Sequence, residues 1–270
     1  MTRADSLVHD LERTILIGAD RDVVFRFFTD TARWASWWGA GSSIEPRPGG
    51  RVVIRYPDGT EASGEVVEIL PPERLVFTYG YTKGIPVPPG ASLVTIQLDP
   101  HRAGTRLRLS HAFADAGVRD EHVQGWRYQL SLFANAVANE LHSALAALVD
   151  RWFGAWSEPD ADARASALES ILTPDVGMRD QFSAIEGITD LLEHLEAVHR
   201  FMPGLTMRRN GDVRHCQGTA LVDWVASMPD GTERARGTSV FILAPDRRIA
   251  SITGFWRPPH SATRNSEERS

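Results

Sequence analysis

The sequence predicts an α+β protein made of two successive parts, each of which combines helices with an antiparallel sheet. Three observations support this prediction. The hydrophobic pattern has a period of two over residues 50–113, and it changes to the helical period at about Asp120. The order of helices followed by sheet then returns in the second half. With 270 residues, of which 42% are hydrophobic, the chain can supply a core to each part.

The first half begins with a strand and two helices. Residues 12–19 (ERTILIGA) are predicted to form a strand, and residues 21–30 a helix with its apolar side chains on one side. The next segment, TARWASWWGAG, carries three tryptophans and is closed by glycines. We therefore expect the order strand, helix, helix before the sheet begins.

About five strands are predicted after these helices, joined by turns. Asp58-Gly59 is a strong hairpin signal, and Pro71-Pro72 and the sequence DPHRAG mark further turns. The strand segments are VVIRY, GEVVEIL, RLVFTYGY, ASLVTIQL and TRLRLSHAF. Because each follows the last through a short connection, we expect an antiparallel meander.

A long helix follows this sheet. Apolar residues recur at spacings of three and four from Trp126 to Leu141, which is the pattern of one helical face. We expect the sheet to wrap around this helix. Neither Gly nor Pro lies between Gly125 and Gly154, so a second helix is expected to abut or fuse with the first, at a stiff junction near Leu141–Ala144 without a flexible linker.

The second half is predicted to be a cone of three helices on a curved four-stranded sheet. Between the first two helices and the sheet lie a short strand, VGMRDQF, and the amphipathic helix GITDLLEHLEAVHRFM, which Pro203-Gly204 ends. The sheet segments are LTMRRNGDVRHC, TALVDWVASM, ARGTSVFIL and IASITGFW. The polar residues 259–270 are expected to form a disordered tail.

Composition and charge exclude several classes of function. A net charge of −6 argues against a nucleic-acid partner, and the single cysteine, Cys216, excludes an internal disulfide framework. With neither a secretory signal nor a long apolar run, we expect a cytoplasmic protein without a membrane partner. No cofactor motif is present, and His194 and His199 point about 140° apart on a helix, so no metal site is expected.

An ordered set of segments in the first half carries a family resemblance. It runs from ERTILIGADRDVVFRFFTD through RWASWWG, EPRPGGRV and SGEVVEILPPERLVFTYGY to the Gly125-Trp126 opening of the long helix. This set resembles the START-like (SRPBCC, helix-grip) superfamily, and more narrowly its branch related to the activator of the ninety-kilodalton heat-shock ATPase. The resemblance implies a domain over residues 8–142 with a cavity for an apolar molecule. It does not imply one reaction, because ligand carriers, polyketide cyclases and chaperone activators all belong to the superfamily.

The second half carries a different resemblance. The segments LVDRWFGAW, TPDVGMRDQFSAIEGITDLLEHL, ALVDW, DGTERARGTSVFIL and RRIASITGFW are similar to SnoaL-like domains of the nuclear transport factor 2 superfamily. The resemblance implies a domain over residues 143–258 with a conical pocket. It also implies a homodimer through the C-terminal sheet, since these domains often pair across its outer face.

Asp180 and His199 are the candidate catalytic residues. Asp180 lies in MRDQF, where resembling isomerases place a general-base aspartate; the alternative is that it caps the following turn or faces solvent. His199 lies on the apolar stripe of its helix, where it is an acid/base partner or, as a lone histidine more often is, a core residue. The other parts of a steroid isomerase are missing, since Trp152 stands in place of its phenol and Ser239 in place of its second acid.

Other residues of the second half are candidates for the pocket or for a hydrolase site. Trp224 is expected to point inward and Asp223 outward, because neighbours on a strand alternate. Asp180, Arg208 and Asp223 would make an epoxide-hydrolase cluster if they converged, which their spacing does not show. The predicted ligand-binding residues of this half are Trp152, Trp156, Trp224, Ser239 and Phe255.

In the first half, aromatic and apolar residues are expected to line the cavity, although such stripes more often only pack. His111 either orients the polar end of a ligand or is bonded to backbone at a strand end. The predicted ligand-binding residues are Trp38, Tyr79, His111, Phe113, Trp126, Leu130 and Phe133.

Three functions fit these patterns. The favoured one is a cytoplasmic protein that binds small apolar molecules in internal cavities. The second is an enzyme on a polyketide-, steroid- or terpenoid-like molecule with Asp180 as acid/base. The third is a chaperone-associated or regulatory interaction protein, which requires an exposed patch on the first half.

Overall fold

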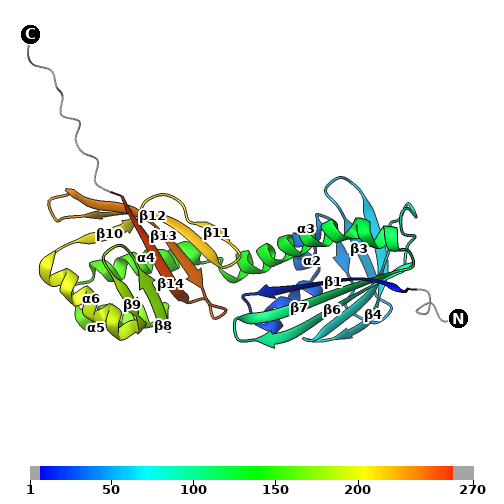
Figure 1. Cartoon of the computed structure of the whole chain (residues 1–270), viewed down its shortest axis with the longest axis horizontal. Coiled ribbons are helices and arrows are strands. Elements are labelled where there is room, and N and C mark those ends of the chain that lie inside the picture. The colour runs from blue at the N-terminus through cyan, green and yellow to red at the C-terminus, as the bar shows by residue number, and fades with distance from the viewer. Residues whose placement is uncertain (1–6, 258–270) are drawn as a thin grey trace, which may run out of the picture. The chain divides into compact units, whose positions relative to one another are not determined.

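The computed structural model describes residues 7–257, and the chain divides after Ser143 into two compact units (Figure 1). Each unit has its own core of buried side chains, built only from its own elements. The predicted α+β class is confirmed for both halves. The tail predicted at residues 259–270 lies outside the described residues.

The first unit is a seven-stranded antiparallel sheet with one long helix. Its strands lie in the order β1-β7-β6-β5-β4-β3-β2. The first strand, β1, therefore forms one edge of the sheet and pairs with the last strand, β7. The elements are β1 (His9–Ile17), α1 (Arg21–Phe25), the 3-10 turn η2 (Arg26–Phe28), α2 (Thr31–Trp38), β2 (Ser43–Ile44), β3 (Arg51–Arg55), β4 (Glu61–Leu70), β5 (Arg74–Tyr79), β6 (Ser92–His101), β7 (Gly104–Phe113) and α3 (Ala116–Leu141).

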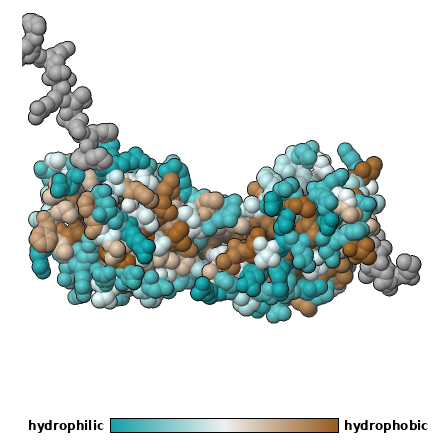
Figure 2. All heavy atoms as spheres, viewed as in Figure 1, coloured by the Kyte–Doolittle hydropathy of each residue, from teal (hydrophilic) through white to brown (hydrophobic). Residues whose placement is uncertain are grey.

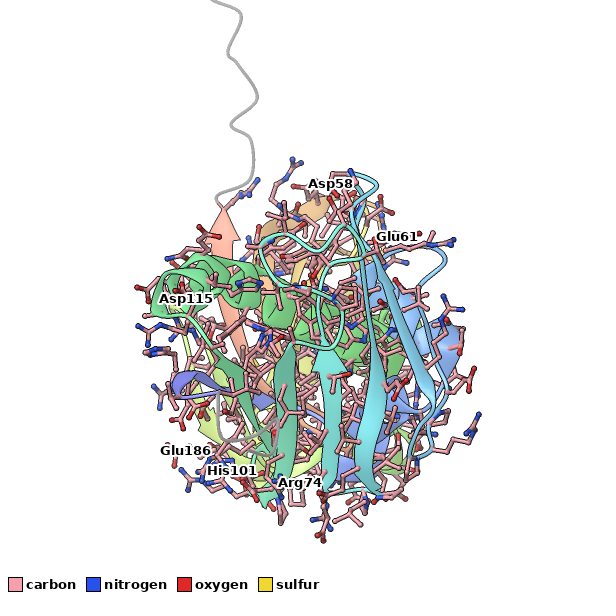
Figure 3. The ribbon with its side chains drawn as sticks, turned by 90° about the vertical axis from the view of Figure 1, so that its right-hand side faces the viewer. Asp58, Glu61, Arg74, His101, Asp115 and Glu186 are labelled. Atoms are coloured by element: carbon pink, nitrogen blue, oxygen red, sulfur yellow. The ribbon has the colours of Figure 1, made fainter. Side chains whose placement is uncertain are left out.

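Helix α3 crosses the sheet and buries the predicted stripe. It begins where the Asp115 side chain accepts a hydrogen bond of 2.9 Å from the Val118 amide, which satisfies one of the amides at the helix start. Figure 3 shows Asp115 at the start of the helix, with Asp58 at one end of the sheet and Arg74 and His101 at the other. The helix therefore covers one face, and the side chains between helix and sheet form the core.

Aromatic residues of α2 and η2 fill the space beside α3. Phe28 stacks on Phe133 at 4.9 Å between ring centres, and Trp37 meets the same ring edge-on at 4.9 Å. Trp34 is fully buried, and its indole donates to the Val53 carbonyl at 3.2 Å. The three tryptophans of TARWASWW are thus the packing surface of α2. Gly39 follows this helix as its C-cap. Its positive φ requires glycine, and a Cβ at that position would collide with the Arg55 carbonyl.

The second unit is a mixed sheet with three helices. Its strands lie in the order β10-β12-β13-β14-β8-β9, with β11 paired to β12. The elements are α4 (Leu145–Ser157), α5 (Ala161–Glu169), β8 (Leu172–Arg179), β9 (Ala184–Glu186), α6 (Gly187–Phe201), β10 (Thr206–Arg209), β11 (Arg214–Cys216), β12 (Thr219–Ser227), β13 (Glu233–Leu243) and β14 (Ile249–Arg257).

The sheet of the second unit is larger than the four strands expected. Strand β8, which precedes α6 in the chain, pairs in parallel with β14, and β9 adds to its other edge. The segment LTMRRNGDVRHC forms two short strands, β10 and β11, rather than one. Parallel pairing needs a long connection, and α6 with the following strands supplies it.

The break between the two long helices falls at the place in the chain that the sequence pattern predicted. Helix α3 ends at Leu141 and α4 begins at Leu145. Over residues 7–257 no single helix is long and apolar enough to cross a membrane. The pair α3–α4 passes that test only when counted together, and the apolar side chains of both helices belong to the two cores.

Figure 2 shows hydrophilic residues over most of the visible face of each unit, with apolar residues scattered among them. Two exposed apolar residues lie on neighbouring strands, Ile242 on β13 and Phe255 on β14, with 41% and 57% of their surface accessible. Phe255 is opposite Thr238 in the pairing, and Ile242 is four residues further on, so both side chains project from the same face of the sheet.

Candidate functional sites

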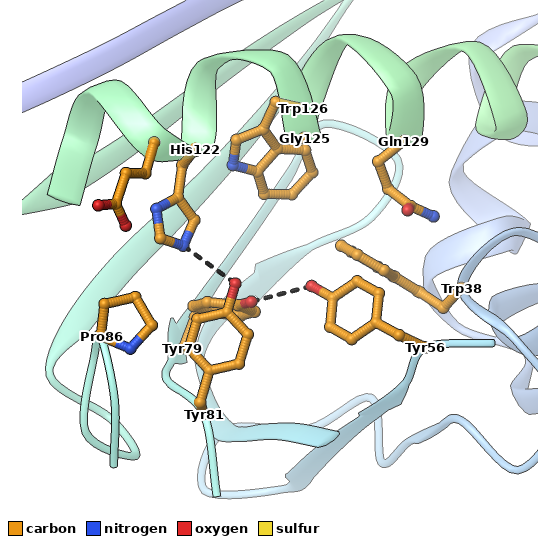
Figure 4. A pocket seen from close by; sticks show the side chains of 10 residues that line it. Trp38, Tyr56, Tyr79, Tyr81, Pro86, His122, Gly125, Trp126 and Gln129 are labelled. Carbon is orange, nitrogen blue, oxygen red and sulfur yellow. Dashed lines mark hydrogen bonds between the residues drawn. The ribbon is translucent and has the colours of Figure 1, made fainter. Parts of the chain in front are cut away.

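The first unit contains a cavity of about 310 Å³ between α3 and the sheet (Figure 4). Its walls are largely aromatic, and its polar groups are hydroxyls, an imidazole, an amide and the carboxylate of Glu121. The lining residues are Trp38, Tyr56, Tyr79, Tyr81, Pro86, Glu121, His122, Gly125, Trp126 and Gln129. A resident molecule would therefore meet ring faces and a few hydrogen-bonding groups.

Two phenols are joined in this cavity. The hydroxyls of Tyr56 and Tyr79 lie 2.9 Å apart. Burial raises the pKa of both phenols above the ordinary value, because a phenolate would lose its hydration inside the protein. Both side chains are therefore neutral O–H groups, and each carries one proton.

His122 presents a lone pair to the same cavity. Its Nδ1 lies 2.7 Å from the Val118 carbonyl, one helical turn earlier. A carbonyl only accepts, so Nδ1 carries a proton, and in the Nδ1–H tautomer Nε2 is an acceptor. The Tyr81 hydroxyl donates to this Nε2 at 3.4 Å, which is longer than a usual hydrogen bond of this type.

His111 does not face the cavity, which corrects its assignment as a ligand-orienting residue. It is fully buried, and the Trp126 indole donates to its Nδ1 at 2.9 Å. Because Nδ1 accepts, Nε2 carries the proton and donates to the Ser92 hydroxyl at 2.8 Å. Ser92 donates in turn to the Tyr79 carbonyl at 2.9 Å. Burial lowers the pKa of His111 well below its ordinary value, so the ring is a neutral support for Trp126.

The other predicted residues of the first half divide between wall and core. Trp38, Tyr79 and Trp126 line the cavity as expected. Phe113, Leu130 and Phe133 do not line it, because they are buried among the core side chains. Residues three or four apart on α3 share one face, but only its first turns border the cavity.

Polar residues that the sequence analysis did not assign complete this site. His122, Trp126 and Gln129 are spaced by four and three residues, so they share one face of α3. Tyr79 and Tyr81 are two residues apart along the sheet. Both spacings were present in the sequence. Taken from the assigned Trp126 and Tyr79, they would have identified His122, Gln129 and Tyr81.

The second unit contains a larger cavity of about 570 Å³. One side is apolar and comes largely from α6 and β10, while charged and amide groups come from the β8–β9 turn and the ends of β13 and β14. The lining residues are Trp156, Asp180, Gln181, Phe182, His194, Val198, Met202, Leu205, Met207, Ala226, Arg234, Ala235, Trp256 and Arg257. This volume is in the usual range for small-molecule sites.

Asp180 both caps a turn and lines this cavity. Its Oδ1 accepts from the amides of Phe182 and Ser183 at 2.8 Å each, and from the Ser183 hydroxyl at 2.9 Å. Its Oδ2 accepts from the Trp256 indole at 3.0 Å. The capping alternative therefore holds together with the pocket position, and Oδ2 is the atom with room for a further donor.

The histidine that shares the cavity with Asp180 is His194, and the assignment of His199 as its partner is corrected. His194, Val198 and Met202 are spaced by four residues and form one ridge of α6 on the cavity. His199 is not among the lining residues, and its Nε2 is buried without a hydrogen-bond partner among residues 7–257. Burial lowers the pKa of His199.

Three predicted pocket residues of the second half lie behind the cavity wall. Trp152 is 2% exposed and packs against Trp156, which does line the cavity. Trp224 points inward as expected, but its indole donates to the Ser239 hydroxyl at 3.0 Å, so each satisfies the other within the core. Their effect on the site is indirect, since the Trp224 ring supports Trp256 at 5.0 Å.

Phe255 was assigned to the pocket, and the structure corrects this by one residue. Phe255 is exposed, whereas the adjacent Trp256 lines the cavity. Neighbouring residues on a strand face opposite sides, so only one of the two aromatic rings can point inward.

The epoxide-hydrolase cluster does not form. Arg208 is exposed and alternates with Met207, which lines the cavity. Asp223 accepts from Thr238 and lies 3.9 Å from Arg214. Neither side chain joins Asp180 at the cavity, so the geometry gives no activated water of that kind.

Family models match both units. Residues 18–138 match the family described as activator of Hsp90 ATPase homolog 1-like protein, and residues 149–252 match the SnoaL-like domain. The chain therefore resembles an AHSA1-like domain over its first half and a SnoaL-like domain over its second. Both predicted resemblances are confirmed, and these domain types support a ligand-binding or an isomerase- or cyclase-like protein.

No curated protein matches the chain. Among solved structures, a SnoaL-like family protein of Agrobacterium tumefaciens matches at 23% identity, covering 44% of this chain and 99% of its own, with a TM-score of 0.41. Protein Ms6760 of Mycobacterium smegmatis matches at 22% identity over 49% of this chain and 89% of its own, with a TM-score of 0.41. CalU16 of Micromonospora echinospora matches at 26% identity over 50% and 78%, with a TM-score of 0.39.

Proposed function

We propose that the chain is a cytoplasmic protein that binds a small, largely apolar molecule in the cavity of the SnoaL-like domain. The observation that carries this proposal is the division of that cavity, of about 570 Å³, into an apolar side and a small set of polar groups. The apolar side comes from side chains without strong hydrogen-bonding groups, among them Val198, Met202 and Met207. Burying a ligand against them is favourable by about 25 cal/mol per Å² of apolar surface removed from water.

The charges at the cavity favour a ligand with an acidic end. Two arginines, Arg234 and Arg257, border it together with one carboxylate, Asp180, and the Arg257 guanidinium also donates to the Thr238 hydroxyl at 3.2 Å. That carboxylate already accepts four hydrogen bonds from its own domain. The two arginines are therefore the stronger attraction for a molecule that enters, and they favour an anion such as a carboxylate or a phenolate.

The fluorescent probes 8-anilinonaphthalene-1-sulfonate and N-phenyl-1-naphthylamine test both parts of this proposal. They share the arylaminonaphthalene frame, and only the first carries a negative charge. We expect one saturable site in the SnoaL-like domain that binds the anionic probe more tightly. Val198→Trp fills the cavity, so it should raise the Kd of both probes at least tenfold.

Glu196→Trp is the matched control, because this exposed residue lies two positions away on the same helix and outside the cavity. It should leave both Kd values within twofold of the wild type. Equal binding by the wild type and Val198→Trp would refute the proposed site. Equal affinity for the two probes would refute the preference for an acid.

A second candidate function is acid–base catalysis in the same cavity. The observation that favours it is that Asp180 and His194 both line the cavity. Native mass spectrometry of the protein purified from its host would identify a retained molecule, and its conversion to product on incubation would establish an enzyme. A protein that takes neither probe and retains nothing would instead favour the third hypothesis, an interaction protein.

A further inference from the structure

The AHSA1-like domain holds a base and a hydrogen-bond donor around one cavity, apart from the site of the proposed function. The base is His122, whose Nδ1 is held by the Val118 carbonyl so that Nε2 turns its lone pair to the cavity. The Tyr81 hydroxyl holds Nε2 only at 3.4 Å, so an incoming molecule can displace it at small cost.

The donor is the Tyr56–Tyr79 pair. Two hydroxyls carry two protons, and the 2.9 Å bond between them uses one. The hydroxyl that accepts this bond keeps its own proton for another acceptor. Its acidity is strengthened by the bond, because hydrogen bonds in a chain polarise one another. A carbonyl oxygen in the cavity is the acceptor that this arrangement fits.

The walls of the cavity indicate an aromatic ligand. Trp38 and Trp126 meet edge to face at 5.6 Å between ring centres, and Trp38 meets Tyr56 in the same way at 5.9 Å. Gln129 donates its amide nitrogen to the Trp37 carbonyl, so the amide oxygen is the end left to accept a hydrogen bond. A cavity of about 310 Å³ is suited to a molecule of one or two rings.

His122 and the phenol pair are close enough to act on one molecule. The ring centres of His122 and Tyr79 are 6.1 Å apart with perpendicular planes, and Figure 4 shows His122 and Tyr56 on either side of the Tyr79 hydroxyl. A ketone presents its carbonyl oxygen and the hydrogen on the next carbon within this span. A base and an oxyanion donor placed together are the groups that proton abstraction beside a carbonyl needs.

We propose that this cavity is a proton-transfer site, in which His122 and the Tyr56–Tyr79 pair exchange the proton beside the carbonyl of a small aromatic ketone. Nε2 of His122 takes the hydrogen, and the electron pair of the C–H bond becomes the C=C bond of the enolate. The carbonyl π pair moves to oxygen, which the phenol O–H holds. The proton on Nε2 exchanges with solvent water, and return of a proton from Nε2 to the carbon restores the ketone, so no other reactant is consumed.

The test follows deuterium entry into 2-tetralone in deuterium oxide by proton NMR. We expect the full-length protein to exchange the proton between the ring and the carbonyl at least a hundredfold faster than buffer with the same concentration of imidazole, which is the lower range for a positioned base. His122→Asn keeps a donor for the Val118 carbonyl and deletes Nε2, so the rate should fall to that of buffer. Tyr56→Phe/Tyr79→Phe should lower the rate at least tenfold.

Tyr128→Phe is the matched control, because this tyrosine lies exposed on α3 outside the cavity. It should keep the wild-type rate. Thermal unfolding of each variant separates a lost group from a lost fold, and Tyr56→Phe alone serves if the double variant does not fold. A wild-type rate equal to that of buffer, or a folded His122→Asn variant with the wild-type rate, would overturn the proposal. Probe binding by the SnoaL-like domain and exchange in this cavity are measured separately, so either proposal can fail without the other.

Discussion

Replacing His111 with Gln removes a titratable ring from the interior of the AHSA1-like domain, and we expect this to weaken the pH dependence of its stability. His111 is fully buried, and burial lowers its pKa well below the ordinary 6.5, with the nearby His122 as a smaller cause. The unfolded chain titrates near that ordinary value. Below it the unfolded state binds a proton that the folded state does not, so stability present above pH 6.5 is lost as the pH falls.

The size of this loss follows from the unfolded state alone. Between pH 7.5 and 5.5 the fraction of unfolded chains with a neutral ring at a pKa of about 6.5 falls tenfold. The folded ring resists protonation over this interval, because burial lowers its pKa well below 6.5 and the Trp126 indole already donates to Nδ1. His111 therefore accounts for about 1.4 kcal/mol of lost free energy of unfolding across these two pH units.

Urea unfolding followed by tryptophan fluorescence at the two pH values measures this term. The wild type should lose about 1.4 kcal/mol more than His111→Gln, which removes the titration and leaves the rest of the chain unchanged. His101→Gln, at the end of β6, is the control and should lose as much as the wild type. The reasoning fails if the His111→Gln variant shows the same loss between pH 7.5 and 5.5 as the wild type.

Two further outcomes are expected in the SnoaL-like domain. Trp256→Phe removes the donor to Asp180 Oδ2 and keeps an aromatic ring, so thermal unfolding should show a loss of about 1 kcal/mol; an unchanged stability would mean that this hydrogen bond contributes nothing. Phe255→Arg places a charge on the face that carries Ile242, where we expect the homodimer to form. Sedimentation should show a dimer for the wild type and a monomer for the variant, and a dimeric variant would contradict pairing through this face.

Most of the fold could be predicted because its elements are periodic over long segments. The apolar stripe from Trp126 to Leu141 predicted α3, and Asp58-Gly59 predicted the hairpin of β3 and β4. The parallel pairing of β8 with β14 was out of reach. It joins Met178 to Ile252, and nothing local to either strand specifies a partner so distant in the chain.

The site was harder to predict because side-chain direction decides it. In the segment GFW both Phe255 and Trp256 are aromatic, so a period of two does not say which ring is inside. His111 and His122 both lie among aromatic residues, so the sequence does not separate them. Only the structure shows that both ring nitrogens of the first are hydrogen-bonded, to Trp126 and Ser92, while Nε2 of the second has a lone pair for the cavity. Asp180 was assigned as a candidate because its position in MRDQF matched a family pattern, and it does line the cavity.

Because the two cores are separate, each domain can serve as an internal control for the other. None of the buried side chains of one core belongs to the other, among the residues that the structure describes. A substitution in one cavity therefore leaves the other cavity present at equal concentration, in the same tube and with the same history of purification. Probe binding in the SnoaL-like domain can report the amount of intact protein when the AHSA1-like domain is altered, and the converse holds for ketone exchange.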